Sequence, residues 1–370
     1  MSARLPRRAL TLLTAAALLA GLGVAACGKK PEEEPTPSPE PVPTTTKPAP
    51  KTSAPVKEVE PWPLTGLPGP PKDRPALAIK IENSPQARPQ AGLELADIVW
   101  EQVVEGGVSR FVAVYHSEIP DEVGPVRSVR PMDGPIAGPT GGLLVFSGGQ
   151  FRFIQQAIDA ELQVLSNDQG AAGFYREPTR KGEHSLFGRP PEFLDQADDD
   201  HQTPPKAQFA FAKDAASCFA GKKGQEVESV AFRLSAAAQP DWTWDSESDV
   251  WLRSENGVEA FAFSEERLSA TNVVALKVEV RAAGGVDAAG SPIPEMLVVG
   301  EGDGLLACNG KVIEVTWEKE SPTDPVVLTG PDGEKVTLAP GKTWVELMPV
   351  YDSEWTLFEP GTKPTATPSP

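Results

Sequence analysis

Short runs of alternating apolar and polar residues dominate the chain from about residue 76 onward. The alternation over 76–81 predicts a β-strand, and the brief apolar run over 143–146 predicts a second, buried strand. Apolar residues three and four positions apart over 150–160 predict an amphipathic helix. Gly148 and Gly149 lie between that strand and the helix, where free backbone N–H groups can hold an anion. An ordinary tight turn is the alternative.

A β-hairpin is predicted where two β-prone runs, 97–104 and 108–116, flank the pair Gly106-Gly107. Paired glycines accept the positive φ angles that a tight turn requires. A helix over 96–105 that ends at the glycine pair is the alternative.

Positive charge gathers at Arg110, Arg127 and Arg130, although the chain is acidic overall. In the predicted hairpin Glu101 is a diagonal neighbour of Arg110, about 7–8 Å away, so these two residues form a candidate structural pair. Arg127 and Arg130, with Ser128 between them, follow a Gly-Pro turn. Guanidinium groups bind carboxylates and phosphates bidentately. The candidate ligand-binding residues are therefore all three arginines and Ser128, together with Gly148, Gly149 and His184. Pairing of each arginine with a nearby acid is the alternative.

A different pattern begins near residue 228, where short alternating runs separated by Asn-Gly and Asp-Gly turns predict antiparallel strands. We expect Trp242 and Trp244 to share one face of their strand and to pack in a core. The expected strands are Val230–Leu234, Trp242–Trp244, Val250–Arg253, Asn272–Val280, Glu295–Val299, Val312–Trp317 and Val326–Leu328.

The N-terminus has the pattern of a bacterial lipoprotein signal. A basic start precedes an uncharged apolar run that ends in Ala25-Ala26-Cys27. That run is too short and too rich in Ala and Gly for a comfortable membrane span. We expect cleavage before Cys27 and acylation of its thiol, since two acyl chains anchor a protein where one holds only marginally.

Proline accounts for 40 of the 370 residues, and much of this excess lies near the ends of the chain. Such segments cannot form a core and act as extended spacers. The expected fold class is α+β, with a mixed α/β-type N-terminal domain and a mainly antiparallel β C-terminal domain. The expected boundaries are 1–26 signal peptide, 27–60 disordered tether, 61–210 N-terminal domain, 211–228 linker, 229–350 C-terminal domain and 351–370 tail, at least partly disordered.

Charge and residue types exclude several functions. The formal net charge of −18 argues against nucleic-acid binding. The three histidines are isolated in the sequence, so we expect no metal site and no cofactor. No nucleophile motif nominates catalytic residues. Cys218 and Cys308 either form a disulfide or stay as buried thiols.

Several motifs resemble the YerB-like bacterial lipoproteins, the family labelled DUF3048. The resemblance spans roughly residues 61–350 and implies a lipid-anchored, two-domain protein outside the cell membrane, with no established activity. Two departures concern Met132–Pro139, whose two Gly and two Pro should shorten a helix, and His184-Ser185, where His-Asn is more usual. The motifs are Pro63-Leu64-Thr65-Gly66, Ala87–Gly92, Ala96–Val99, Val104–Gly107, Ser109-Arg110-Phe111, Gly124–Ser128, Gly148-Gly149, Phe174–Arg176, His184–Phe187, Asn272–Val274, Gly302–Leu305, Gly310–Trp317 and Pro340–Trp344.

We therefore expect a membrane-anchored extracytoplasmic lipoprotein that binds a protein partner or an anionic cell-envelope ligand through its N-terminal domain. The alternative is a cell-wall-directed enzyme, hydrolase-like, that uses Arg127, Arg130 and His184. Convergence of those three side chains would favour the enzyme, and a salt-bridged arrangement would favour the binding protein.

Overall fold

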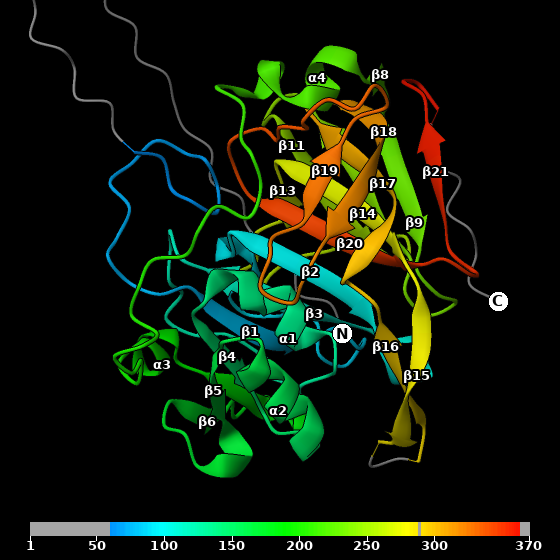
Figure 1. Cartoon of the computed structure of the whole chain (residues 1–370). Helices are drawn as coiled ribbons and strands as arrows, with labels where there is room; N and C mark the ends of the chain where they lie inside the picture. The colour runs from blue at the N-terminus through cyan, green and yellow to red at the C-terminus, as the bar shows by residue number, and fades with distance from the viewer. Residues whose placement is uncertain (1–59, 288–289, 363–370) are drawn as a thin grey trace, which may run out of the picture. The chain divides into compact units, whose positions relative to one another are not determined.

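The structure is a computed structural model that describes residues 60–287 and 290–362 (Figure 1). The signal peptide, Cys27 and nearly all of the tether predicted for 27–60 lie outside the described residues. Within the described part, no helix is long and apolar enough to cross a membrane.

A mixed sheet of 11 strands forms the centre of the molecule. Ten strands follow the order β19-β18-β17-β14-β20-β2-β3-β1-β4-β5, and β8 pairs with β18. Their bounds are β1 Leu77–Glu82, β2 Ile98–Val103, β3 Ser109–Tyr115, β4 Leu143–Phe146, β5 Gln163–Ser166, β8 Gln225–Glu226, β14 Asn272–Val278, β17 Gly300–Cys308, β18 Lys311–Lys319, β19 Val327–Thr329 and β20 Thr343–Pro349.

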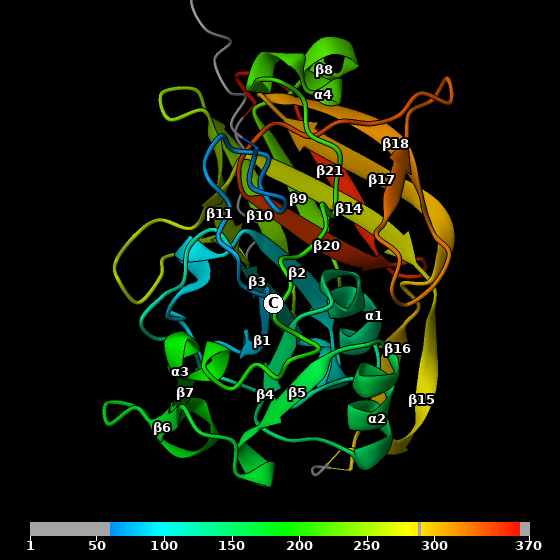
Figure 2. The ribbon, with the colours of Figure 1, turned by 60° about the vertical axis from the view of Figure 1, so that its left-hand side comes forward.

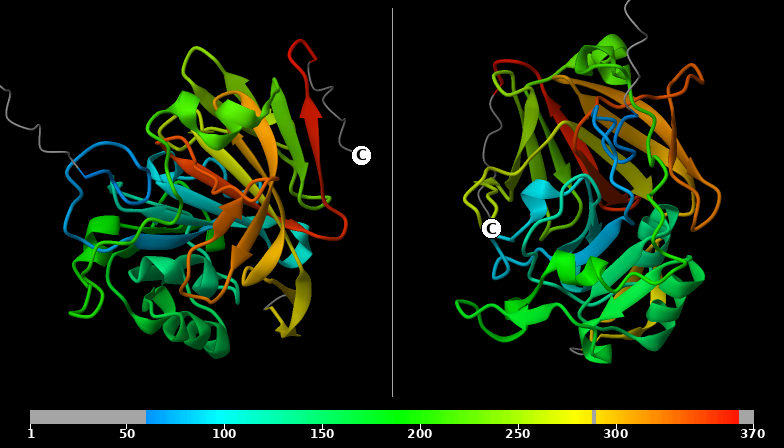
Figure 3. Two further views of the ribbon diagram at one scale, coloured as in Figure 1. Left: turned by 45° about the horizontal axis from the view of Figure 1, so that its top comes forward. Right: turned by 90° about the vertical axis from the view of Figure 1, so that its left-hand side faces the viewer.

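Strand β20 joins the two halves of the chain within this sheet. It runs parallel to β14 on one side and parallel to β2 on the other. Strands from the expected N-terminal and C-terminal domains therefore belong to one sheet, and blue-to-cyan and orange-to-red strands lie in the same body (Figure 3). The mixed sheet supports a mixed fold. However, strands greatly outnumber helices, so the N-terminal half is not clearly an α/β domain.

The central sheet is covered on both faces by apolar packing. Helices α1 (Asp133–Ala137) and α2 (Phe151–Asp159) pack on one face, where Phe153 and Ala157 meet Leu144 and Phe146 (Figure 2). A second sheet, of order β12-β11-β10-β9-β21 with β13 beside β11, packs on the other face. Its strands are β9 Ser229–Arg233, β10 Pro240–Asp245, β11 Val250–Glu255, β12 Val258–Glu259, β13 Ser269–Ala270 and β21 Glu354–Phe358.

Smaller elements complete the fold. Trp242 is fully buried, as expected for core packing, while Trp244 is only partly buried. Two ribbons form separate two-stranded sheets, and short helices connect the larger elements. These are β6 Phe174–Arg176 with β7 Leu186–Gly188, β15 Val280–Val286 with β16 Pro292–Met296, α3 Pro190–Leu194, α4 Phe219–Lys223 and the 3-10 turns η1 Leu93–Leu95, η2 Glu105–Gly107, η3 Gly138–Thr140, η4 Asn167–Gln169, η5 Gly182–Ser185 and η6 Ala215–Ser217.

The predicted hairpin is confirmed as β2 and β3, and the alternative helix is wrong. Its register differs from the prediction by one residue, because Glu101 pairs with Phe111 and Gln102 pairs with Arg110. The turn is closed by a hydrogen bond from Val104 N to Val108 O of 2.8 Å. Since side chains alternate between faces, this shift places Glu101 and Arg110 on opposite faces of the sheet.

Several segments differ from the simple picture of two domains and a linker. The expected linker 211–228 contains η6, α4 and β8, and its Cys218 forms a disulfide with Cys308. The expected tail includes strand β21, which pairs with β9. The predicted shortening over Met132–Pro139 is seen, because α1 has five residues and gives way to the 3-10 turn η3.

Candidate functional site

Polar side chains from the ends of β1, β2 and β3 are divided between the two faces of the central sheet. Alternation sends Glu82, Gln102 and Arg110 to the face covered by α1 and α2, and Asn83, Glu101 and Ser109 to the opposite face. The arginine cluster on the helical face comprises Lys80, Glu82, Glu105, Arg110, Arg127, Arg130 and Asp133. The Arg253 network on the other face comprises Asn83, Glu101, Ser109, Arg253, Glu255 and Glu346.

Lys80 and Asp133 form the buried base of the arginine cluster. Lys80 Nζ donates to Asp133 Oδ1 at 2.7 Å, and Gln102 Nε2 donates to the same oxygen at 2.5 Å. The other carboxylate oxygen accepts the backbone N–H of Arg130 at 2.7 Å. Burial lowers the pKa of Lys80 to about 8, and Asp133 limits the fall. Asp133 thereby ties the first turn of α1 to the sheet.

Arg130 is held by a bidentate ion pair with Glu105. Its Nε and Nη2 atoms donate to the two carboxylate oxygens at 2.6 and 2.9 Å, and both residues are buried. This is the strong fork geometry of arginine with a carboxylate. Glu105 belongs to the β2–β3 turn, so Arg130 has a structural partner of the kind foreseen as the alternative to ligand binding.

Arg127 and His184 meet at the carboxylate of Glu82. The Nε atom of Arg127 lies 3.5 Å from Glu82 Oε2, and His184 Nδ1 lies 3.0 Å from the same oxygen. Arg127 Nη1 also donates to Glu183 Oε2 at 2.7 Å, which lowers the pKa of Glu183. Arg127 therefore lies between one buried and one exposed carboxylate. Arg130 is bound to Glu105 instead, so Arg127, Arg130 and His184 do not share one partner.

Arg110 has no carboxylate partner among the described residues. It is only 8% exposed, and Nη1 donates to the carbonyl of Ser128 at 3.3 Å. Burial, followed by the charges of Arg130 and Arg127, lowers the pKa of Arg110 to about 10. The predicted Glu101–Arg110 pair is wrong, because the register shift places Glu101 on the other face.

The two glycines after β4 are required by close packing. A Cβ atom at Gly148 would lie 1.8 Å from Asp168 Oδ2, and one at Gly149 would lie 2.4 Å from Val129 Cγ1. The turn is also joined to the arginine segment, since Val129 N donates to Gly148 O at 2.9 Å and the hydroxyls of Ser128 and Ser147 lie 3.2 Å apart. These contacts agree with a tight turn and bring Ser128 against it.

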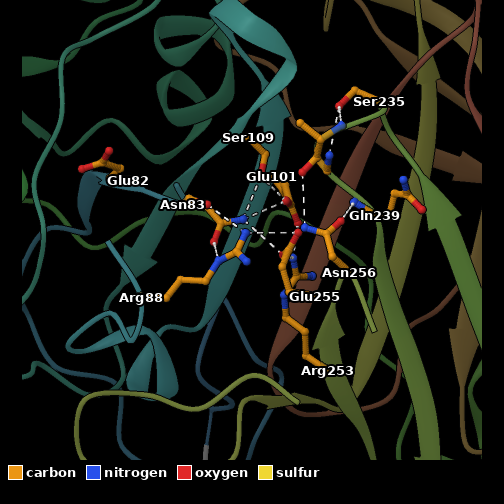
Figure 4. Close-up of polar contacts among 12 residues, drawn as sticks. Glu82, Asn83, Arg88, Glu101, Ser109, Ser235, Gln239, Arg253, Glu255 and Asn256 are labelled. Atoms are coloured by element: carbon orange, nitrogen blue, oxygen red, sulfur yellow. Dashed lines mark hydrogen bonds and ion pairs between the residues drawn. The ribbon is translucent and has the colours of Figure 1, made fainter. Parts of the chain in front are cut away.

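The Arg253 network joins the two large sheets. Arg253 Nη2 donates to Glu101 and Glu255 at 2.6 Å each, and Nη1 donates to Glu346 at 2.9 Å. Figure 4 shows Asn83 directed at this group, where its amide donates to Ser109 Oγ at 2.8 Å and to Glu255 Oε2 at 3.2 Å. Two strands of the central sheet, β2 and β20, are thus connected to β11 of the second sheet through a single guanidinium.

Aromatic rings pack against the guanidinium at the centre of this network. The Arg253 guanidinium lies 4.5 Å from the centre of the Trp344 ring and 5.3 Å from that of Trp242. Trp242 Nε1 donates to Glu346 Oε1 at 2.9 Å. Burial and the neighbouring Glu101 raise the pKa of Glu346 well above its usual value, and burial also raises the pKa of Glu255. Burial opposes the charged form of Arg253, but the three carboxyl groups around it outweigh burial and raise its pKa.

Sequence reasoning missed the Arg253 network. Trp251, Arg253 and Glu255 alternate along β11 and all point inward. The sequence did contain a signal for this network. Arg253 and Glu255 occupy the inward positions of the strand, where apolar side chains are expected, and buried charges require partners. Those partners come from β2 and β20, which no local pattern connects to β11.

Comparisons with known proteins agree with this fold. Residues 64–203 match the family described as "Protein of unknown function (DUF3048) N-terminal domain", and residues 230–345 match its C-terminal domain. The chain is 28% identical over 317 residues to "Putative lipoprotein YerB" of Bacillus subtilis (strain 168), which covers 79% of this chain and 87% of that protein.

The crystal structure of YerB from Bacillus subtilis superposes with a TM-score of 0.65 at 22% identity, covering 80% of this chain and 99% of the other. This likeness shows a shared fold. Both halves of the chain match, and the same protein is found by sequence and by structure. The chain belongs to the YerB-like, DUF3048 family.

Proposed function

We propose that the protein is a lipid-anchored extracytoplasmic binding protein whose arginine cluster receives an anionic group, a carboxylate or a phosphate, from a cell-envelope ligand or partner. The observation that carries this proposal is the buried guanidinium of Arg110, which has a backbone carbonyl but no described carboxylate as its partner. Arg127 stands beside it with a partly exposed side chain.

The pairing within the cluster, rather than its net charge, supports an incoming anion. Lys80 pairs with Asp133, Arg130 with Glu105, and Arg127 with Glu82 and the exposed Glu183. The four cations therefore face four carboxylates, but Arg110 is the one cation that makes no ion pair of its own among the described residues. Removing a charge from water costs several kcal/mol unless it is paired, so Arg110 is held at a cost within the folded protein. An anion that accepts hydrogen bonds from Arg110 and Arg127 would offset that cost, and guanidinium groups suit planar carboxylates and phosphates.

The position in the sheet also suits a ligand site. Strands β1, β4 and β5 are parallel, and the arginine cluster lies where β1 ends at Glu82 and β4 leads into the Ser147–Gly149 turn. In open α/β sheets, ligands bind outside the carboxyl ends of such strands.

The proposed location rests on the relative and on the N-terminal pattern. The relative carries the name "Putative lipoprotein YerB", and the present chain has Cys27 after a signal-like run. We infer that Cys27 carries the anchor, with membrane attachment through its lipid and the proline-rich segment as spacer. The disulfide between Cys218 and Cys308 suits an oxidising compartment outside the cytoplasm.

The ion pairs favour binding over the alternative of a hydrolase-like enzyme. Arg127 and Arg130 each hold a carboxylate, and His184 contacts Glu82. Arg130 therefore has a structural role, and Arg110 and Arg127 are the proposed ligand-binding arginines. No described contact nominates a nucleophile among these residues.

The test is calorimetric titration of the full chain with inorganic phosphate and, separately, citrate. We expect Arg110→Gln and Arg127→Gln each to weaken binding at least tenfold, and Arg152→Gln, on the exposed side of α2, to leave it unchanged. Arg110→Gln should not destabilise the protein, because it removes a buried charge that lacks a carboxylate. Unchanged binding in both variants, or a loss above about 2 kcal/mol of stability in Arg110→Gln, would show that Arg110 is structural.

A further inference from the structure

A pocket of about 270 Å³ opens on the other face of the central sheet, beside the Arg253 network. Its walls are largely apolar, with Phe111 at the inner end and Phe261, 41% exposed, at the mouth. Asn83, Arg88, Arg253 and Glu255 also line it. The pocket is thus a short apolar channel that leads to buried charges, and it is separated from the arginine cluster by the sheet itself.

One carboxylate oxygen at the inner end is incompletely satisfied. Glu255 Oε2 accepts hydrogen bonds from Arg253 and Asn83, whereas Glu255 Oε1 accepts none. A guanidinium nitrogen of Arg88 lies 3.3 Å from Oε1 but makes its hydrogen bonds to Asn83. A buried carboxylate oxygen without a hydrogen bond is costly, so this atom favours a donor that enters through the pocket.

The charges around the pocket are closely balanced. Glu101 and Glu255 contact the buried guanidinium of Arg253, Glu346 favours its neutral form because burial raises its pKa, and Glu259 lines the pocket wall. Arg88, with 26% of its side chain exposed, and Arg267, 5.3 Å from the centre of the Phe261 ring, supply positive charge. The case for a cation therefore rests on Glu255 Oε1 and not on the net charge. Within the described residues, no group of three or more His, Cys, Asp or Glu is arranged to hold a metal ion.

Arg88 shows which chemical group fits at Glu255. Its guanidinium reaches the carboxylate from the pocket side, and its neighbours include the apolar side chains that would cover an aliphatic stem. A ligand with a similar head and stem would find the Glu255 carboxylate at the inner end and apolar contact with the Phe261 ring near the mouth, beside the guanidinium of Arg267.

We propose that this pocket binds a guanidinium or primary ammonium group on an aliphatic stem, with Glu255 as its anionic partner and Phe111 and Phe261 beside the stem. Arg88 competes with the ligand for Glu255. The group belongs either to a free small cation or to an arginine or lysine side chain of a partner polypeptide.

The test is calorimetric titration of the full chain with agmatine, as a free guanidinium, and with a short peptide that carries one central arginine. We expect Glu255→Gln to weaken binding at least tenfold, Phe261→Ala to weaken it several-fold, and Arg88→Ala to strengthen it. Glu266→Gln is the matched control, because Glu266 is exposed near the pocket but does not line it.

Tight binding of the peptide with weak binding of agmatine would identify a polypeptide as the source of the cation, and the reverse would identify a small molecule. The proposal is overturned if neither probe binds, or if Glu255→Gln binds as wild type does. If Glu255→Gln does not fold, unchanged binding by Phe261→Ala together with no gain in Arg88→Ala overturns it equally. These titrations use cations, so their failure leaves the anion-binding proposal for the arginine cluster standing.

Discussion

Replacement of Arg253 by Met should be among the most damaging single changes in the folded part of the chain. Arg253 donates to Glu101 and Glu255 at 2.6 Å and to Glu346 at 2.9 Å, and all four residues are buried. Methionine fills much of the volume but leaves the carboxyl groups without their shared cation. Loss of one partner from a buried ion pair costs about 3–5 kcal/mol of stability. Because Arg253 holds two carboxylates at 2.6 Å, those of Glu101 and Glu255, we expect a loss near the upper value. Such a loss is a large fraction of the 5–15 kcal/mol typical of a folded domain.

The cost should depend on pH in a definite direction. Without Arg253, burial and mutual repulsion raise the pKa values of the carboxyl groups above the unfolded value of about 4.3. The folded variant then binds protons more tightly than the unfolded chain, so its stability increases as the pH falls toward that value. The deficit relative to wild type should therefore be largest at pH 8 and smaller at pH 5.

Urea unfolding followed by circular dichroism measures this deficit at both pH values. Arg233→Met is the control, because Arg233 forms an exposed pair with Glu354 at 3.1 Å in the same small sheet and should cost less than about 1 kcal/mol. A deficit of Arg253→Met below about 1 kcal/mol at pH 8, or one that is equal at pH 5 and pH 8, would refute the argument that Arg253 compensates buried negative charge.

Four further predictions concern other parts of the molecule. Glu346→Gln should keep or increase the free energy of unfolding at pH 8, because the raised pKa of Glu346 means that the folded state favours the neutral carboxyl group, which glutamine resembles. A decrease above about 2 kcal/mol in urea unfolding would contradict this. Replacing Cys218 and Cys308 by Ser should cost about 2–5 kcal/mol, since the disulfide closes a loop of 90 residues, and reduction of wild type should match the variant. Burial lowers the pKa of Lys319 to about 8, so burying its charged form destabilises the folded protein fully below pH 8 and progressively less up to about pH 10.4, the pKa of an unfolded lysine. Lys319→Met should therefore increase the free energy of unfolding at pH 7 and weaken its change between pH 8 and pH 10, as urea unfolding can measure. Cys27→Ser should move the protein out of the membrane fraction in cell fractionation, and unchanged fractionation would defeat the lipid anchor.

Local patterns predicted the elements that depend on neighbours in sequence. The strand β1, the β2–β3 hairpin, β4 and α2 follow from alternation, glycine turns and helical spacing, and the structure contains them within one or two residues. The hairpin register was wrong because a five-residue turn closed by Val104 and Val108 replaced the assumed two-residue turn. One residue of shift was enough to exchange the faces of Glu101 and Gln102.

The partners of charged side chains depended on contacts that sequence order hides. Glu101 pairs with Arg253, 152 residues away, whereas Arg110 makes no ion pair among the described residues although Glu82 lies opposite it on β1. Arg127 and Arg130 both lower the pKa of Arg110, so the three arginines lie near one another, but the arginine without an ion pair is Arg110 and not Arg127 or Arg130. Strands β20 and β21 were also missed, because their place in the sheets is set by distant strands.

The place of β20 bears on how the sheet would assemble if the chain is exported as proposed. This strand lies between β2 and β14 although, in an export that starts at the N-terminus, it would be nearly the last to emerge (Figure 1). Until residue 343 has passed, the edges of β2 and β14 have no partner, and open edges are prone to wrong pairing. A chain of this topology acquires its central sheet only when export is almost complete. Its earlier segments therefore depend on remaining extended, or on protection by other factors at the membrane, until that moment.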